Sequence, residues 1–289
     1  MLQQKVRINF YSKTIMTTPV YQVIVIMLTA LMLGCAVPKH KTLGDKPNDA
    51  AKNGAAFYKQ AATMQWKQRD SLVIIWWEEK HYPVWLQKFS RITINGVDAV
   101  SSKDVRINAY VSQDYFSLGN SNEWARICLT PMAAAIIAKS WHCVLPTTKI
   151  VDDIYHQSKV RLDPVPMFAF RDSTPTMWHH HLIIEGQRKG KPGLIAGIKK
   201  DVVQTPKLKE QGKENKVAIY GWHKLDGKPI QPLYTGHINW YVDYSHGIRL
   251  LYETIYVNGK RMLFSNAIKD EGLHHLLCNE HGCYASMHT

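Results

Sequence analysis

The chain has 289 residues, which is long enough to bury a substantial core. Hydrophobic residues make up 45% of it and charged residues 20%, and this balance excludes a disordered, collagen-like or coiled-coil protein. Lys and Arg outnumber Asp and Glu by 36 to 23, so the formal net charge is +13 and the surface should favour anionic partners.

Residues 1–34 have the order of an export signal peptide. The cations Lys5, Arg7 and Lys13, with no acidic residue among them, precede an apolar run at 20–33. That run has 14 residues, and a membrane-spanning helix needs about 20. The segment therefore predicts export rather than a spanning helix.

The residues Met32-Leu33-Gly34-Cys35 resemble the lipobox of bacterial lipoproteins, in which the cysteine is lipidated and becomes the mature N-terminus. The resemblance implies an exported, membrane-anchored lipoprotein that faces the periplasm or the cell surface. An uncleaved anchor, or cleavage without lipidation, remain alternatives. Residues 35–55 are polar and predict a flexible tether. This location, and the lack of any nucleic-acid-binding motif, argue against a nucleic-acid partner.

Residues 56–289 show no repeat and no second linker, and they predict a single α+β domain with N-terminal helices and a largely antiparallel C-terminal sheet. The expected elements, in chain order, are helix at 55–80, a helical turn near 84–89, strands at 91–95 and 104–112, helices from Pro131 to Trp141 and from Thr147 or Thr148 onward, a helix or turn at 177–187, and β-like segments at 193–203, 216–223, 236–244 and 247–260. Thr130 is the expected N-cap of the first of those two helices, and Asn258-Gly259 is a turn signal.

The segment around residue 245 holds several side chains capable of proton transfer close together in the sequence. We expect a hairpin whose turn is Tyr244-Ser245-His246-Gly247, with Gly247 permitting an unusual backbone conformation. Strand alternation would put His237 and Asp243 together on its polar face.

A turn centred on Ser245 would place His237 opposite Glu253, and Asp243 close to His246. Either pair would let a carboxylate orient an imidazole. A polar outer face of an antiparallel sheet would give the same pattern without any chemistry.

Cys143 is the candidate nucleophile. It should lie in the loop before the second predicted helix, where a helix N-terminus stabilises a thiolate. If Cys35 is lipidated, Cys278 and Cys283 are close enough in sequence to form a disulfide, since exported proteins form disulfides readily. Cys128 and Cys143 would then be paired or free.

The tail that holds Cys278 and Cys283 is also rich in histidine, but its spacing matches no standard zinc site, so we expect a disulfide and no metal. The sequence has no HExxH, GxSxG, Walker A or GxGxxG motif. No cofactor is therefore expected.

Two stretches, LPTTKIVDDIY at 145–155 and AIYGWHKLDGKPIQPLY at 218–234 running into YVDYSHGIRL, resemble an uncharacterised group of secreted bacterial proteins. The order of Cys143, His237 and then His246 or Glu253 is similar to that of NlpC/P60-type cysteine peptidases and amidases. The second resemblance implies cleavage of an amide bond, most naturally in peptidoglycan.

The leading hypothesis is therefore a cell-envelope amide hydrolase. Cys143 would attack, His237 would take its proton, and Glu253 or His246 would hold the imidazole, with Asp243 beside His246 as a further catalytic candidate. Substrate contacts are expected from the following side chains: Lys199, Lys200, His223, Tyr244, Ser245 and Arg249.

Two other classes of function remain open. A polysaccharide lyase needs a Tyr or His base and a cation that neutralises a uronate, and Tyr244, His246 and Arg249 would supply them. A non-catalytic lipoprotein would only bind its partner. For either enzyme the expected partner is an anionic envelope polymer, peptidoglycan or an acidic glycan. The non-catalytic lipoprotein would bind such a polymer or a partner protein.

Overall fold

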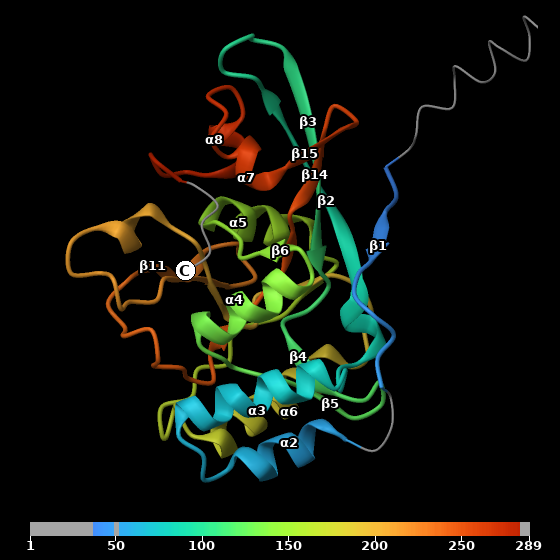
Figure 1. The fold of residues 1–289 in the computed structure, drawn as a ribbon, viewed down its shortest axis with the longest axis vertical. Helices are drawn as coiled ribbons and strands as arrows, with labels where there is room; N and C mark the ends of the chain where they lie inside the picture. Colours follow the sequence, from blue (N-terminus) through green and yellow to red (C-terminus); the bar gives the residue numbers. More distant parts are fainter. Residues whose placement is uncertain (1–36, 49–51, 284–289) are drawn as a thin grey trace, which may run out of the picture. The chain divides into compact units, whose positions relative to one another are not determined.

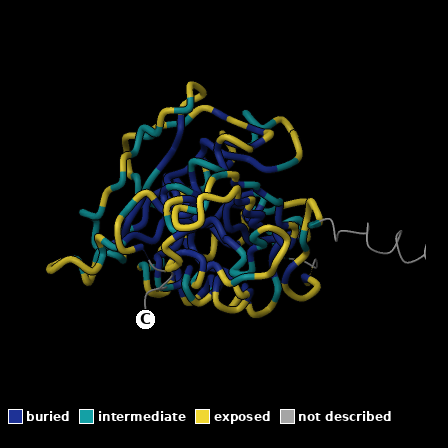
Figure 2. Tube along the Cα trace, turned by 90° about the horizontal axis from the view of Figure 1, so that it is seen from above, coloured by how far each residue is buried: buried dark blue, intermediate teal, exposed yellow. Residues whose placement is uncertain are grey.

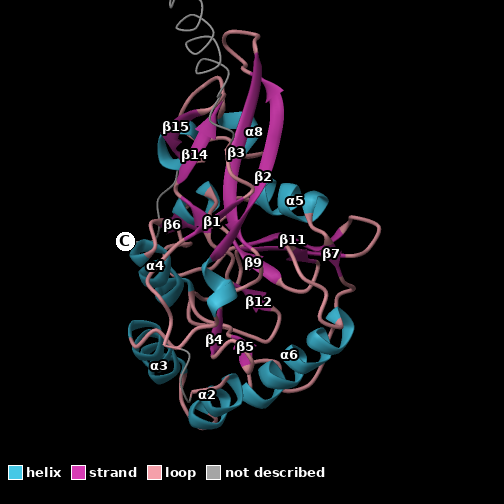
Figure 3. Cartoon of the chain, turned by 90° about the vertical axis from the view of Figure 1, so that its right-hand side faces the viewer, coloured by secondary structure: helices cyan, strands magenta, loops and turns pink. Residues whose placement is uncertain are grey.

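The computed structural model describes residues 37–48 and 52–283, so the predicted signal peptide and Cys35 lie outside the described residues. The predicted α+β class is confirmed: helices pack around several sheets, most of whose strand pairs are antiparallel (Figures 1 and 3). The described residues group into one unit by their contacts.

The larger sheet has the order β1-β2-β3-β13-β6, and β14 pairs with β3 and with β15. Its strands are β1 (His40–Thr42), β2 (Lys88–Val97), β3 (Asp104–Ser112), β6 (Cys143–Val144), β13 (Leu251–Tyr252), β14 (Thr254–Val257) and β15 (Lys260–Leu263). Asn258 and Gly259 both have positive φ, so they form the predicted turn between β14 and β15. The long strands β2 and β3 come from the N-terminal half, so the sheet is not confined to the C-terminal third.

The predicted tether contains a strand. His40–Thr42 pairs antiparallel with β2 at the edge of the sheet, and Leu43 is buried after it. The polar composition of this stretch concealed the strand because an edge strand is held by backbone hydrogen bonds and needs no apolar side chains. The described part of the domain therefore begins well before residue 56.

A second sheet has the order β11-β10-β9-β12, with β9 and β12 parallel. Its strands are β9 (Lys200–Val202), β10 (Ile219–His223), β11 (Pro229–Tyr234) and β12 (His246–Gly247). Two short pairs complete the strands, β4 (Ser117–Gly119) with β5 (Trp124–Arg126), and β7 (Val160–Arg161) with β8 (Ile195–Ala196).

The described helices are α2 (Gly54–Ala61), α3 (Trp66–Glu78), α4 (Pro131–Ser140), α5 (Thr148–Gln157), α6 (Thr174–Arg188), α7 (Phe264–Ala267) and α8 (His274–Leu277), with 3-10 turns at Val84–Gln87 and Pro206–Lys209. The Thr130 hydroxyl accepts from the Ala133 amide and the Thr147 hydroxyl from the Ile150 amide. The predicted Thr130 N-cap is therefore confirmed, and Thr147 caps α5 in the same way, because a capping oxygen satisfies an otherwise unpaired amide of the first turn.

Helices α2, α3 and α6 gather with β4 and β5 at the end of the fold opposite to α8 and the β14–β15 hairpin (Figures 1 and 3). The apolar run at 71–77 belongs to α3, and its Trp76 packs edge-on against Phe57 of α2. Buried segments run through the middle of this arrangement, and exposed ones follow its loops (Figure 2). The second sheet lies between the helical end and the larger sheet, and it carries the polar residues considered below (Figure 3).

Two glycines give a test of this packing. A Cβ on Gly247 of β12 would lie 2.4 Å from Tyr115 and 2.8 Å from Lys199 Cβ, whereas a Cβ on Gly186 of α6 meets nothing within 4 Å. We expect Gly247→Ala to lower the free energy of unfolding by about 1–3 kcal/mol through overpacking. Gly186→Ala should raise it by about 0.5–1 kcal/mol because alanine is the better helix former. Urea unfolding of both variants measures this; equal effects would contradict the packing around β12.

Candidate functional site

Asp243 is a buried carboxylate that receives hydrogen bonds on both oxygens. Its side chain is 1% exposed. Oδ1 accepts from the Ser245 amide (2.8 Å) and the Ser245 hydroxyl (2.5 Å). Oδ2 accepts from Arg171 Nη2 (3.0 Å) and from the Tyr241 hydroxyl (3.3 Å). These bonds fix the carboxylate between the loop before α6 and the loop that leads into β12.

The surroundings of Asp243 keep it ionised. Burial alone would raise its pKa, but the interaction with His246, the two Ser245 hydrogen bonds and the Lys200 ammonium together hold that pKa well below its usual value. His246 is itself uncharged near neutral pH, so the Ser245 donors and the Lys200 charge carry this effect there. The site therefore holds a fixed negative charge.

Two histidines flank Asp243 and differ in exposure. His246 is buried, its Nε2 lies 3.9 Å from Asp243 Oδ1, and burial lowers its pKa to about 4. His237 is half-buried, and its ring centroid lies 4.6 Å from that of Tyr241. Burial, together with the charges of Lys200, Arg171 and other nearby cations, lowers the pKa of His237 against the opposing pull of Asp243. His237 is therefore a neutral imidazole at pH 7 that solvent can reach.

Tyr241 remains a phenol under the same conditions. Burial and the adjacent Asp243 charge raise its pKa to about 12. Its ring is half-buried, and the ring centroids of Tyr241, His237 and His246 form a triangle: His237 lies 4.6 Å from Tyr241, and His246 lies 6.0 Å from each of the other two. The neutral base and the protonated acid thus stand side by side over one carboxylate.

Strand β9 contributes Lys200, the cation whose charge acts on Asp243. Successive side chains alternate in a strand, so Lys200 points to one face and Asp201 to the other. Lys200 Nζ lies 5.3 Å from the Trp222 ring. We call the following residues the Asp243 cluster: Arg171, Lys200, His237, Tyr241, Asp243, Ser245 and His246.

A second polar group lies deeper in the fold. Lys199 is buried, donates to the Tyr244 carbonyl and lies 3.5 Å from Cys128 Sγ. His180 of α6 is fully buried against Tyr244, and neither of its ring nitrogens has a hydrogen-bond partner among the described residues. Burial lowers the pKa of His180 to about 2, so it is neutral. No substrate can reach these side chains without a rearrangement.

The predicted hairpin at 236–260 is wrong. Residues 237–245 form turns, with the Tyr241 amide donating to the Ile238 carbonyl, and β12 pairs parallel with β9. The carboxylate of Asp243 accepts from the amide two residues on, which is the Asx turn that this residue type favours. The predicted closeness of Asp243 and His246 is observed, but it arises from this turn.

Several predicted substrate contacts are buried instead. Arg249 is 0% exposed, donates to the carbonyls of Ser112 and Ile195, and lies 4.1 Å from the Tyr115 ring centroid. The Tyr244 hydroxyl accepts from the Met167 amide at 2.6 Å. Lys199, Lys200, Ser245 and His246 are also buried, so the sequence named groups of this region without showing which of them face solvent.

Gly247 is not needed for an unusual backbone conformation, as the sequence predicted, but for close packing. Its φ is not positive, and the space for a side chain is taken by Tyr115 and Lys199. The glycine therefore permits close packing of β12 on its neighbours.

Cys143 does not lie in a loop. It forms β6, where it pairs with Tyr252, and its Sγ donates to the Trp141 carbonyl at 3.4 Å. Burial and the nearby Glu253 raise its pKa well above the usual value, so the thiolate is disfavoured. The helix that should have activated Cys143 begins only at Thr148, after a strand that the short Cys-Val segment did not reveal.

Glu253 and His223 also have partners away from the Asp243 cluster. Glu253 accepts from the Ser265 hydroxyl at 3.1 Å, and its amide donates to the His142 carbonyl. It is therefore not opposite His237. His223 lies 2.9 Å from Asp152 and stacks on Tyr155, so it joins β10 to α5.

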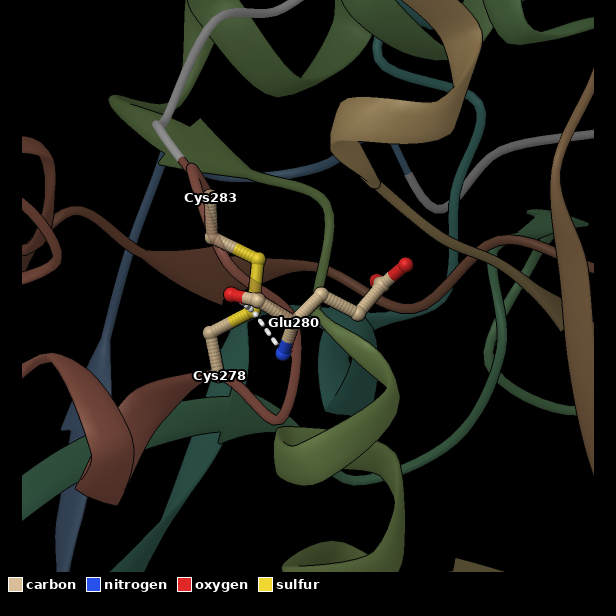
Figure 4. Close-up of side chains that lie close together, drawn as sticks. All are labelled: Cys278, Glu280 and Cys283. Carbon is tan, nitrogen blue, oxygen red and sulfur yellow. Dashed lines mark hydrogen bonds between the residues drawn. A yellow bond between two sulfur atoms is a disulfide. The ribbon is translucent and has the colours of Figure 1, made fainter.

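Cys278 and Cys283 are joined in a disulfide after α8, and Glu280 lies between them in sequence and close to them in space (Figure 4). These three side chains are grouped closely enough to hold a metal ion if the thiols were reduced. In the disulfide form the two sulfur atoms are no longer thiolate ligands. Cys128 and Cys143 are both free and buried.

The sequence reasoning missed Arg171 and Tyr241. Arg171 follows two exposed phenylalanines in a loop, where nothing in the local pattern marks a site. Tyr241 alternates with His237 and Asp243 along the chain, so it would share the polar face of the expected hairpin, but the alternation alone gives it no role. Its position two residues before Asp243 was the available signal.

No family model matches the chain, and the comparisons find no similar curated protein and no similar solved structure. The two resemblances noted in the sequence therefore stay predictions.

The buried histidines predict an acid-sensitive fold. His180, His181 and His246 have pKa values of about 2, 3 and 4 in the folded protein, all lowered mainly by burial from the ordinary histidine value of 6.5. Each depressed pKa means that the unfolded chain binds a proton that the folded chain does not, so stability falls as pH drops below about 6.5. Asp201, whose pKa burial raises to about 6, acts in the opposite direction.

At pH 5 these four groups give a net uptake of about two protons on unfolding, or about 2.7 kcal/mol per pH unit. Urea unfolding between pH 5 and 7 measures that slope. His180→Leu should reduce it by about one proton, and His179→Ala, which changes an exposed residue of the same helix, should leave it unaltered. A stability independent of pH over this range would refute the neutral buried histidines.

Proposed function

We propose that the protein is an acid–base enzyme that cleaves an anionic polysaccharide of the cell envelope by β-elimination. The observation that carries the proposal is the pairing of His237 with Tyr241. A neutral imidazole and a protonated phenol, both partly exposed, lie with ring centroids 4.6 Å apart over the ionised Asp243. Two groups whose environments push their pKa values apart are typical of a base and an acid that work together.

In the proposed reaction His237 takes the proton from C5 of a uronate residue. The electron pair of that C–H bond forms the C4–C5 double bond as the C4–O glycosidic bond breaks. The Tyr241 hydroxyl gives its proton to the departing oxygen. His237 then returns a proton to Tyr241, so that no further reactant is needed.

Cations beside the pair would stabilise the charge that develops on the substrate carboxylate. Arg171 is partly exposed, with 39% of its side chain accessible, and its Nε and Nη2 both donate hydrogen bonds to Asp243. The Lys200 ammonium, whose charge also acts on His237, is a second cation at this site. The lyase predicted from the sequence took its base from Tyr244 or His246 and its cation from Arg249. Here His237 is the base, Tyr241 the acid and Arg171 the cation.

A second candidate is the cysteine-dependent amide hydrolase of peptidoglycan, and one observation favours it. Cys128 Sγ lies 3.5 Å from Lys199 Nζ, which would make Cys128 rather than Cys143 the nucleophile and Lys199 its base. Against it stand the burial of Cys128 and its raised pKa, which burial sets despite the adjacent ammonium. The lyase needs no thiol, so Cys128→Ser and Cys143→Ser should both keep its activity.

We further propose that the protein is exported and anchored through lipidated Cys35, with an anionic envelope polymer as its partner. Support comes from the order of cations, apolar run and Gly34-Cys35 in the sequence. Within 37–48 and 52–283, none of the helices is long and apolar enough to cross a bilayer.

The lyase proposal predicts a characteristic product. Incubation with uronate-containing polymers should give oligosaccharides that carry a C4–C5 double bond, detected by ultraviolet absorbance and mass spectrometry. His237→Ala should lower kcat/KM by at least about 100-fold, since it removes the base, and Tyr241→Phe by a similar factor. His179→Ala changes an exposed histidine away from this pair and should leave activity intact.

Two results would contradict the proposal. One is hydrolysed product without the double bond. The other is full activity in His237→Ala.

A further inference from the structure

A pocket lies beside the Asp243 cluster and shares a residue with it. Its walls include Gln65, Trp66, Arg69, Asp172, Trp240 and Tyr241. Tyr241 is the proposed acid, so whatever occupies this pocket is in reach of the reacting centre. The sequence does not predict this pocket, because its walls come from α3, the loop before α6 and the loop before β12, which are distant in sequence.

Arg69 is a buried cation with unused hydrogen-bonding capacity at this pocket. Its side chain is 6% exposed, and its Nε has no hydrogen-bond partner among the described residues. The next residue, Asp70, is hydrogen-bonded to the Thr130 hydroxyl. A buried guanidinium nitrogen without a partner is costly, which favours an anionic or strongly accepting ligand.

Two tryptophans form the other side. The Trp66 and Trp240 rings are nearly parallel, with an interplanar angle of 12° and centroids 6.4 Å apart. Trp240 is 46% exposed although it is large and apolar. Trp66 and Arg69 lie three residues apart on α3, so they share one face of the helix. Indole rings at a pocket wall offer flat apolar surfaces, and the C–H face of a pyranose fits such a surface.

We propose that this pocket is a subsite for a pyranose that carries a carboxylate, with Arg69 binding the carboxylate and Trp66 and Trp240 packing on the sugar ring. The inference rests on the proposed function and gives its substrate class more closely: a polymer with a uronate next to the bond that breaks. Asp172 is exposed at the same pocket, where solvent screens its charge, whereas Arg69 is buried and screened much less. The Asp70 carboxylate interacts with Arg69 and offsets part of its charge. The unpartnered Arg69 Nε is therefore the feature that favours an anionic ligand.

Binding of small, unreactive probes tests the subsite. The probes are methyl β-D-glucuronoside, its uncharged carboxamide and methyl β-D-glucoside, each titrated into the whole protein and followed by tryptophan fluorescence and calorimetry. We expect the glucuronoside to bind at least about tenfold more tightly than the other two. Trp240→Ala should weaken it by about tenfold or more, and Arg69→Gln should remove the preference for the carboxylate over the amide.

Lys159→Gln is the matched control, because it removes one positive charge at a different pocket, near β1 and β2. It should leave all three affinities unchanged. Equal binding of glucuronoside and carboxamide by the wild type would overturn the proposal, and so would unaltered binding in Trp240→Ala. Neither comparison depends on whether Arg69→Gln folds.

The same titrations separate the subsite from the reaction. Selective binding that survives in His237→Ala, in a protein that forms no unsaturated product, would retain the subsite and reject the lyase. If the protein forms unsaturated product but binds the glucuronoside and the carboxamide equally well, the lyase is retained and the subsite is rejected.

Discussion

The polar half of the structure depends on one constraint: the buried carboxylate of Asp243 must stay charged. Burying an ion is costly unless hydrogen bonds and opposite charges offset the lost hydration. Ser245, Arg171 and Tyr241 donate to Asp243, and Lys200 adds a positive charge. These partners come from the loop before α6, from β9 and from the turn into β12. Satisfying one carboxylate therefore fixes three segments that are distant in sequence.

The same constraint sets the proton chemistry. The Asp243 charge raises the pKa of Tyr241 and would raise that of His237, but burial and nearby cations keep His237 neutral. A base and an acid in usable protonation states at pH 7 result from this balance. His246, which is nearer to Asp243 in sequence, is too deeply buried to meet a substrate, and it acts by packing beneath the pair.

Local signals predicted α4 and α5 well because the causes of these two helices are local. Thr130 before Pro131, and Thr147 before α5, are caps that work in any tertiary context. The predicted strand around Asp243 is wrong because the same residues fit both a strand's alternation and an Asx turn. The hydrogen bond from the Ser245 amide to Asp243 favours the turn. The predicted exposure of Lys199 and Arg249 is also wrong. Both are buried, and backbone carbonyls accept their hydrogen bonds inside the fold. The position of Arg171 and the pocket at Arg69 depend on tertiary contacts, which no periodicity encodes.

The most direct measurement of the central claim is the pKa of His237 in wild type and in Asp243→Asn, followed by NMR of the imidazole resonances. The wild-type value should lie below 6.5, and removing the Asp243 charge should lower it further, because that charge is what opposes burial and the neighbouring cations. Arg171→Gln removes a cation from the same place and should move the pKa of His237 upward. A His237 that titrates at its ordinary value in all three proteins would contradict the account, since Asp243 would then not govern the site.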